Sequence, residues 1–261
     1  MKILIGRLKY AIKNAVWMLN GYIGKRVTIK TPEKVTVLIT YFNPIRMKII
    51  NHQVRNILKC DFVEKVIISN HNPDVQIDEM LKIDDERLAI ISQDRKRACG
   101  YRWRIAENLN AKYLIVIDDD IFLFPYQLGR LCENLIREPE NPHGFSGMVS
   151  LGNGEFLYRE KEDIEVDYLC EVYGVTRDHI GRYFEIESIL AKEDSTLLDA
   201  IEHLGDFVVI SKTGPQNSRI HNVGNLLRSK TFNMPGLANH MDQEFAAVLA
   251  RVSQAVKNIH P

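Results

Sequence analysis

One segment of the chain restricts its possible folds more than any other. Five apolar residues, Tyr113 to Ile117, are followed directly by three aspartates and then by a second apolar run, Ile121 to Leu123. A short apolar run rich in β-branched residues is typical of a strand that is buried on both faces. Such strands belong to parallel sheets covered by helices. The segment therefore predicts an α/β protein whose polar chemistry lies where this strand ends.

The rest of the chain alternates strand-like and helix-like segments, as this class of fold requires. Buried strands are expected at Val35 to Thr40 and Val63 to Ser69, with a weaker one at Leu88 to Ile91. The other expected elements are helices at 46–58, 78–83, 102–109, 125–137, 195–210 and 241–256, strand-like stretches at 148–158 and 165–176, and loops at 139–147 and 217–236. We expect a mostly parallel central sheet with helices on both faces. No linker is evident, so residues 35–261 are expected to form one domain with two halves, 35–124 and 125–261.

Composition excludes several functional classes. The chain has 34 basic and 34 acidic residues, so it has no overall positive charge with which to bind nucleic acid. Its four cysteines lie far apart without a CxxC pair, which argues against a structural zinc site and a disulfide framework and favours a reducing, cytoplasmic location. Neither a phosphate-binding GxxxxGK[ST] loop, nor GxGxxG, nor a GxSxG elbow is present.

The first 34 residues form a basic arm. They contain eight lysines and arginines against Glu33 alone, about +7, which leaves about −7 on the remaining residues of this neutral chain. Apolar residues recur every three or four positions, which predicts an amphipathic helix. The uncharged run Asn14 to Gly24 is too short to span a bilayer, and no signal cleavage site follows it. Two roles remain open: packing on the domain, or peripheral docking on an anionic membrane surface at the cytoplasmic face.

Asp118, Asp119 and Asp120 are the sharpest chemical feature. Three adjacent carboxylates at the end of a buried strand repel one another, and a divalent cation would compensate their charge. Hard oxygen ligands suit Mg²⁺ or Mn²⁺, which also bind phosphate oxygens. Asp118 and Asp120 share a side of the chain as it leaves the strand, so one could bind the metal while the other binds a ribose or a metal-bound water. The alternative is a solvated acidic turn or a helix cap.

A basic segment lies just upstream of the aspartates. Planar guanidinium groups bind phosphate oxygens in pairs and can stack on a base. This segment therefore favours contact with a phosphate or nucleotide, whereas the alternative is a solvated helix face. The cations of the segment are Arg95, Lys96, Arg97, Arg102 and Arg104.

Together these features resemble the GT-A class of nucleotide-sugar glycosyltransferases, with IDDDI at 117–121 similar to the DxD motif of that class. Several stretches resemble the exostosin-like α-N-acetylhexosaminyltransferases more closely. They are VTVLITYFNP (35–44), VEKVIISNHN (63–72), AKYLIVIDDDI (111–121), HGFSGM (143–148) and IEHLGDFVVIS (201–211). The resemblance covers roughly 35–212 and implies a GT-A (Rossmann-like) fold, with a nucleotide-binding half at 35–124 and a smaller acceptor and catalytic half at 125–261.

The resemblance implies roles for individual residues. Asp118 and Asp120 would be the DxD carboxylates, with Asp120 the better metal ligand and Asp119 in contact with the nucleotide. His240 is the more attractive third metal ligand, and His221 is its competitor. The residues expected near the uracil, ribose, diphosphate or sugar are Thr40, Tyr41, Arg46, Asn70, Arg95 and Arg102.

The family places a carboxylate before an apolar run in its catalytic half. Glu202 lies nearest that position and Asp206 competes with it; either would face the anomeric carbon or a hydroxyl of the donor sugar. Arg219 or Arg228 would take the place of the late arginine that contacts the diphosphate in that family. A row of residues on a predicted strand, Tyr168, Glu171 and Tyr173, could contact an acceptor.

These features predict a metal-dependent glycosyltransferase. It would use Mn²⁺ or Mg²⁺ and move a hexose or N-acetylhexosamine from a UDP-sugar to a glycan or lipid-linked acceptor, with retention of configuration expected. One alternative is a sugar nucleotidyltransferase, although the Gly-rich loop expected after the first strand is absent. Another is a non-catalytic module that binds a nucleotide or sugar on the same fold.

Overall fold

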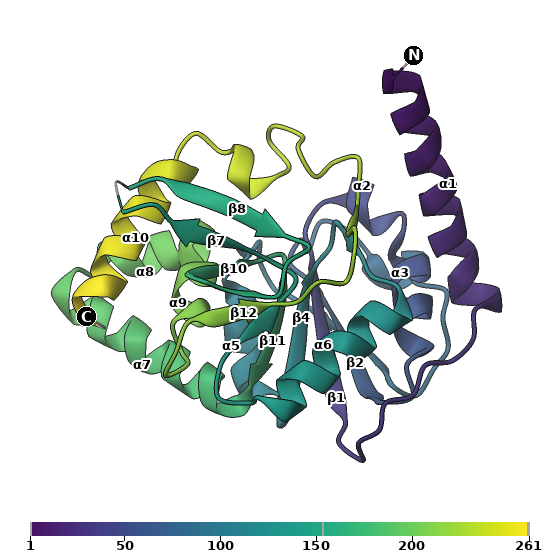
Figure 1. The fold of residues 1–261 in the computed structure, drawn as a ribbon, viewed down its shortest axis with the longest axis horizontal. Coiled ribbons are helices and arrows are strands. Elements are labelled where there is room, and N and C mark those ends of the chain that lie inside the picture. The colour runs from purple at the N-terminus through teal and green to yellow at the C-terminus, as the bar shows by residue number, and fades with distance from the viewer. Residues whose placement is uncertain (1, 153, 260–261) are drawn as a thin grey trace.

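The computed structural model describes residues 2–152 and 154–259 and confirms the α/β architecture (Figure 1). Within those residues, the central sheet has eight strands in the order β3-β2-β1-β4-β11-β6-β12-β9. Their bounds are β1 Val35–Tyr41, β2 Val63–Asn70, β3 Leu88–Ser92, β4 Tyr113–Asp118, β6 His143–Gly144, β9 Ile164–Val166, β11 Val172–Thr176 and β12 Ser218–Ile220. The strands predicted at 35–40, 63–69, 88–91 and 113–117 are all present.

The register of the sheet brings the ends of its first strands to one edge. β3, β2, β1 and β4 run parallel, and Thr40 lies opposite both Ser69 and Asp118. β11 runs antiparallel to β4, with Val172 opposite Ile117, so the residue that precedes β11 lies beside the end of β4. Polar side chains from both halves of the chain therefore meet at this edge.

Helices cover both faces of the sheet, because successive side chains of its strands point to opposite sides. On β1, Val37 and Ile39 face one apolar cluster, whereas Leu38 faces the other. Helices α2 Pro44–Met47, α3 Ile50–Leu58, α4 Ile77–Met80 and α6 Pro125–Arg137 pack in the first cluster. Helices α5 Tyr101–Asn108, α7 Arg177–Glu193, α8 Thr196–Ala200, α9 Asp206–Ser211 and α10 Phe245–Ile259 pack in the second.

The second half differs most from the sequence prediction. The stretch expected at 148–158 is a hairpin in a separate three-stranded sheet, β10-β7-β8. The stretch expected at 165–176 is three short strands, and α7 was not predicted. A two-stranded sheet joins the segment after the aspartates to the late loop. The bounds of these strands are β5 Ile121–Phe122, β7 Ser146–Ser150, β8 Phe156–Glu160, β10 Tyr168–Cys170 and β13 Leu227–Arg228.

The helix predicted at 195–210 contains a wider turn. α8 and α9 are joined by a π-helical turn, Ile201–Gly205, followed at once by Asp206. A side chain at Gly205 would place its Cβ 2.9 Å from Cγ2 of Val252, so glycine permits the close approach of α10. Turns of this kind are rare and frequently occur at functional sites. The closing helix begins at Phe245 rather than 241, after a short 3₁₀ turn, Asn239–Met241.

Helix α1, Lys2–Ile23, confirms the helix predicted in the basic arm. It runs along one side of the molecule, and its amino-terminal end points away from the body (Figure 1). Trp17 is fully buried: its indole Nε1 donates to the carbonyl of Leu123 at 3.0 Å, and its ring stacks on Phe122 with centroids 4.5 Å apart. Among the described residues, no helix is both long and apolar enough to cross a membrane.

Candidate nucleotide-sugar site

A cavity of about 940 Å³ lies at the edge where the parallel strands end. The ends of β1 and β4 form its floor, and α2, α5 and the turn before α9 form its sides. The chain segment after β13, residues 229–242, lies over it. The cavity thus occupies the position where open α/β sheets bind ligands.

The three aspartates lie in this cavity, and two arginines bind them. Arg102 Nη1 lies 2.5 Å from Asp118 Oδ1. Arg46 Nη1 lies 2.6 Å from Asp119 Oδ1, and its Nη2 lies 2.8 Å from Asp120 Oδ2. From sequence, a bound metal alone was expected to supply the compensating charge. In the structure, the protein itself supplies part of that charge.

The compensation is incomplete at Asp120. Burial raises the pKa of its carboxyl group well above the ordinary value, the charges of Asp119 and Asp118 add to that, and Arg46 only partly opposes them. Burial also raises the pKa of Asp118, with Arg102 acting in the opposite direction. The aspartate site therefore has an excess of negative charge that a further cation would relieve.

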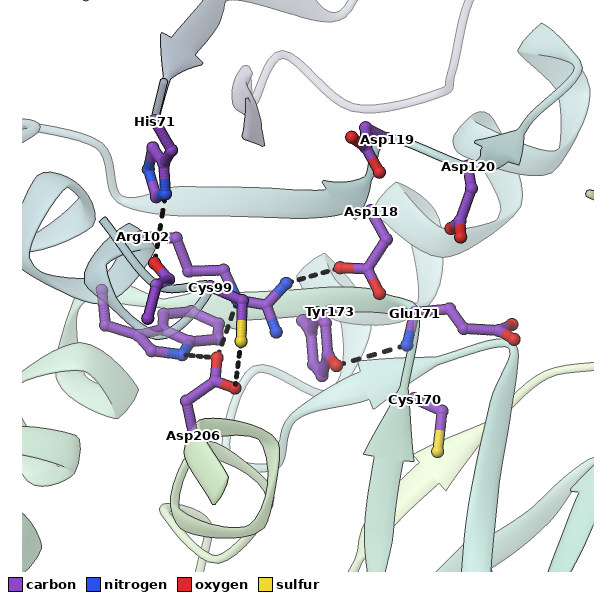
Figure 2. A network of polar contacts seen from close by, with 12 residues as sticks. His71, Cys99, Arg102, Asp118, Asp119, Asp120, Cys170, Glu171, Tyr173 and Asp206 are labelled. Carbon is purple, nitrogen blue, oxygen red and sulfur yellow. Dashed lines mark hydrogen bonds and ion pairs between the residues drawn. The ribbon is translucent and has the colours of Figure 1, made fainter. Parts of the chain in front are cut away.

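Arg102 joins the two halves of the chain. Its Nε donates to Asp206 Oδ2 at 2.8 Å while its Nη1 holds Asp118, and the side chains of Arg102 and Asp206 are only 4% and 2% exposed (Figure 2). Trp103 Nε1 also donates to Asp206 Oδ2, at 2.7 Å. The Arg102 guanidinium lies 4.6 Å from the ring centroid of Tyr173. These contacts fix Asp206 and Asp118 relative to each other.

Glu171 is the backbone outlier of the site. It has a φ of 68°, in the left-handed region that residues other than glycine seldom adopt, and this conformation separates β10 from β11. Its carbonyl accepts from the Asp118 amide at 2.9 Å, and its carboxylate accepts from Ser146 Oγ at 2.8 Å and from Arg228 Nη2 at 2.7 Å. Figure 2 shows its carboxylate reaching toward the side of the cavity that holds Asp120. Strained residues of this kind cluster at functional sites.

Arg46 anchors the segment that lies over the cavity, residues 229–242. Arg46 Nε donates to Thr231 Oγ1 at 3.1 Å, and its Nη2 donates to the Leu237 carbonyl at 3.1 Å. Further along, His240 Nε2 lies 2.9 Å from Asn233 Oδ1. His240 therefore borders the cavity and contacts its own segment.

The structure brings most of the predicted site residues together. Those that line the cavity are Thr40, Tyr41, Arg46, Arg102, Asp118, Asp119, Asp120, Asp206 and His240. The ring of Tyr41, however, is fully buried in the core, where its hydroxyl bonds to Gln53.

Three predicted site residues lie outside the lining, as do the alternatives His221 and Arg219. Asn70 uses its side chain for a turn, donating to the Val75 carbonyl at 2.7 Å. Arg95 is exposed at the surface. Glu202 contributes only its carbonyl to this region, accepting from the Gly100 amide at 2.9 Å, and its side chain does not line the cavity. Of the two competing carboxylates, Asp206 is the one that faces the site.

Other cavity residues had little or no sequence signal. Arg228 was considered only as a substitute for a family arginine, and Glu171 only within a row of strand residues that could contact an acceptor or form one face of the sheet. His71 directly follows Asn70, and Arg97 lies in the basic segment two residues after Arg95. His71 thus lines the cavity where its neighbour Asn70 was predicted, whereas Arg97 was itself among the cations expected to contact a phosphate.

The aspartates offer the carboxylate oxygens that a hard cation such as Mg²⁺ binds. Each arginine engages one oxygen, Oδ1 of Asp118 and Oδ2 of Asp120, and within the described residues no hydrogen bond reaches the second oxygen of either carboxylate. No three His, Cys, Asp or Glu side chains in that part of the chain converge into a complete metal site. Mg²⁺ commonly uses one or two carboxylates together with phosphate oxygens and water, so Asp118 and Asp120 are a sufficient protein contribution to such a site.

Comparisons with known proteins show the fold. No protein-family model and no curated protein sequence matches the chain. A crystal structure of GalNAc-T7 with UDP, GalNAc and Mn²⁺ is similar over 86% of this chain and 48% of its own, with a TM-score of 0.59 and 10% identity. The chain thus spans about half the length of that structure, and it has a GT-A-like fold.

A second solved structure is similar to the chain with a lower TM-score. CMP:2-keto-3-deoxy-manno-octonic acid synthetase complexed with CTP is similar over 84% of this chain and 99% of its own, with a TM-score of 0.48 and 12% identity.

Proposed function

We propose that this chain is a metal-dependent glycosyltransferase that transfers a hexose or N-acetylhexosamine from a UDP-sugar to a glycan or lipid-linked acceptor. One observation carries the proposal: Asp118, Asp119 and Asp120 end a central parallel strand of a GT-A-like fold and open into a cavity large enough for a nucleotide sugar. The UDP, GalNAc and Mn²⁺ in the GalNAc-T7 structure support this choice of donor and metal.

The charges that line the cavity support a role for the metal. Six carboxylates and five basic side chains border it. The diphosphate of a nucleotide sugar would add two negative charges to this nearly balanced lining, and one divalent cation would offset them. Asp118 and Asp120 would hold the metal through their second oxygens, with His240 as the proposed third protein ligand. When bound, the metal supplies Lewis-acid stabilisation of the charge that develops on the departing diphosphate.

The side chains of the protein would orient the donor. Arg46 borders the end of β1, where we place the nucleoside together with Thr40 and Asp119. The guanidinium carbon of Arg97 lies 4.2 Å from the ring centroid of Tyr101, and Arg97 borders the same cavity. We place the diphosphate beside this guanidinium group. Burial acts to lower the pKa of Arg46, but the charges of Asp119 and Asp120 outweigh it and raise the pKa, so this guanidinium stays positive.

Asp206 is the carboxylate that we place beside the donor sugar. It borders the cavity, and its hydrogen bonds to Arg102 and Trp103 fix its orientation. Glu171 and Tyr158, whose hydroxyl accepts from Arg228 at 2.6 Å, line the side formed by the smaller sheet, where we place the acceptor. Retention of configuration and a closer relationship to the exostosin-like enzymes belong to the same proposal.

Isothermal titration of the full chain with UDP, with and without Mn²⁺, tests the proposal. Asp120→Asn is expected to weaken Mn²⁺-dependent UDP binding roughly 100-fold, because an amide is a poor ligand for a hard cation. Asp199→Asn, at an exposed aspartate outside the cavity lining, is the matched control and should bind UDP as the wild type does.

A screen of UDP-sugars for Mn²⁺-dependent hydrolysis completes the test. Release of free sugar and UDP is the expected result. UDP affinity that is unchanged in Asp120→Asn would contradict the metal assignment. Tight UDP binding without turnover of any donor would contradict the transferase and favour a binding module. Pyrophosphate release from a nucleoside triphosphate and a sugar would favour a nucleotidyltransferase.

A further inference from the structure

Helix α1 presents an apolar stripe to solvent. Its large side chains recur at spacings of three and four residues, so they lie on one face of the helix. Each is more than half exposed, which is unusual for so many apolar side chains on one element. The stripe consists of Leu8 (61%), Ile12 (54%), Val16 (52%), Leu19 (56%) and Ile23 (80%), with Tyr22 (52%) at its edge.

The opposite face of α1 is fixed to the body of the protein. The Tyr10 hydroxyl donates to the Arg228 carbonyl at 2.7 Å, and Trp17 is buried against Phe122. At Gly21, an added Cβ would lie 3.0 Å from the Cβ of Arg55, so the helix approaches α3 closely there. Because these contacts set the rotation of the helix, its apolar stripe is held outward.

Lysines lie along one border of this stripe. Lys9 and Lys13 are exposed, and each follows a stripe residue by one position, which is about 100° around the helix axis. The arm to residue 34 contains a single acidic residue, Glu33, against eight cations. An apolar face bordered by positive charge complements a surface that is apolar inside and negative outside.

We propose that α1 is an interfacial helix that binds the surface of an anionic lipid bilayer through this stripe. The apolar side chains would enter the boundary between headgroups and acyl chains, while Lys9 and Lys13 would meet lipid phosphates. A second copy of the chain is the other possible occupant of the stripe. Pairing two copies would bring together two arms of about +7 each, so charge disfavours it.

The proposal does not depend on the catalytic assignment, but the two fit together. The inner face of α1 contacts β5 and β13, which border Asp120 and contain Arg228. These strands would therefore lie about one helix diameter, roughly 10 Å, from the lipid. A lipid-linked acceptor could then be bound close to the cavity.

Co-sedimentation of the full chain with lipid vesicles tests the proposal. The chain is expected to bind vesicles containing equal amounts of phosphatidylcholine and phosphatidylglycerol, to bind pure phosphatidylcholine weakly, and to dissociate as salt is raised. The double variant Ile12→Glu/Leu19→Glu should bind the anionic vesicles at least about tenfold more weakly. Ile189→Glu/Leu157→Glu, which changes two similarly exposed apolar residues elsewhere, is the matched control and should bind as the wild type does.

A folding check and a second variant distinguish loss of membrane binding from loss of folding. Thermal unfolding establishes that the variants are folded, and Lys9→Ala/Lys13→Ala provides a second variant that leaves the stripe intact and should weaken anionic binding roughly tenfold. Wild-type protein that stays free of anionic vesicles would overturn the proposal, as would full binding by the folded stripe variant. A dimer that this variant converts to a monomer would assign the stripe to a second copy. UDP binding is expected to be unchanged in all these variants, so failure here would not bear on the catalytic assignment.

Discussion

Arg102 and Arg46 both form ion pairs with the aspartates after β4, but they lie in different surroundings. Arg102 is 4% exposed and lies between Asp118 and Asp206, which come from opposite halves of the chain. Arg46 binds Asp119 and Asp120 and also donates to Thr231 and Leu237 in the segment over the cavity. Arg102 thus connects residues from the two halves of the chain, whereas Arg46 anchors the segment over the cavity.

The difference shows that one type of ion pair can serve two purposes. A charge buried as deeply as Arg102 is tolerated only while its partners remain, so its loss should damage the whole fold. Arg46 borders the cavity, and ligand groups could replace some of its contacts. Its loss should be felt mainly in residues 229–242. The following substitutions test this contrast.

Arg102→Met should have the largest effect. It leaves Asp206 buried without its cationic partner, and the free energy of unfolding should fall by about 3–5 kcal/mol in urea denaturation. Arg104→Met, two residues along the same helix, removes a side chain that is 41% exposed and should cost about 1 kcal/mol or less. Equal losses in the two variants would remove the distinction between Arg102 and an ordinary surface cation.

The stability of the protein should depend on pH through His71, which lies near Arg102. Burial, with a contribution from the charge of Arg102, lowers the pKa of His71 from 6.5 to about 4. Because the unfolded state takes up the proton at a higher pH, the stability contributed by neutral His71 falls as pH drops from about 6.5 to about 4, by up to about 3 kcal/mol. Urea denaturation at several pH values should therefore show a smaller acid loss for His71→Gln than for the wild type.

NMR titration of His71 distinguishes the effects of Arg102 and Arg46 on its pKa. Arg102→Met should raise the pKa of His71 but leave it below 6.5, because burial is the larger cause of the shift. Arg46→Met should leave the pKa of His71 as it is. A larger rise with Arg46→Met than with Arg102→Met would contradict the arrangement described above.

Arg46→Met should have a smaller and more local effect. The loss of its hydrogen bonds to Thr231 and Leu237 should speed amide hydrogen exchange in residues 229–242, with a cost in overall stability of about 2 kcal/mol. The central sheet should keep its protection. Lys48→Met, at an exposed position just after α2, is the control and should leave exchange in this segment unchanged. Uniform exchange across the protein would show that Arg46 supports the whole fold.

Glu202→Gln is expected to have the smallest effect. The side chain of Glu202 lies outside the cavity, so turnover should change by less than about twofold and stability by less than about 0.5 kcal/mol. Asp206→Asn is the positive control, because that carboxylate holds Arg102 and faces the cavity. A Glu202→Gln variant that loses turnover while Asp206→Asn retains it would return the catalytic role to Glu202.

The regular half of the molecule was predictable from sequence for a physical reason. Strands such as Val35–Tyr41 and Tyr113–Asp118 are buried on both faces, so each is a short apolar run with a polar residue where it ends. Parallel pairing then places these ends together, and the position of Asp118 at a ligand-binding edge follows. The helix that precedes β4 was likewise visible from its spacing.

The second half lacked such signals. A single left-handed residue, Glu171, separates two strands that read as one continuous stretch. The π-helical turn 201–205 is not encoded by any simple period, and it decides which carboxylate faces the cavity. Arg46 and Arg102 lie 73 and 16 residues from the aspartates that they bind. Contacts over such separations depend on the completed fold, so both arginines were predicted near the nucleotide, but their ion pairs with the aspartates were not.

The backbone at Glu171 has a mechanical consequence. Its carbonyl is bound to the amide of Asp118, its carboxylate is bound to Arg228, and β10 of the smaller sheet ends immediately before it. Any shift of that sheet must therefore act on this one peptide, and through it on both sides of the cavity at once. A ligand bound on the side of the cavity that the smaller sheet lines would then alter the orientation of the aspartates, and a change at the aspartates would alter that side in turn.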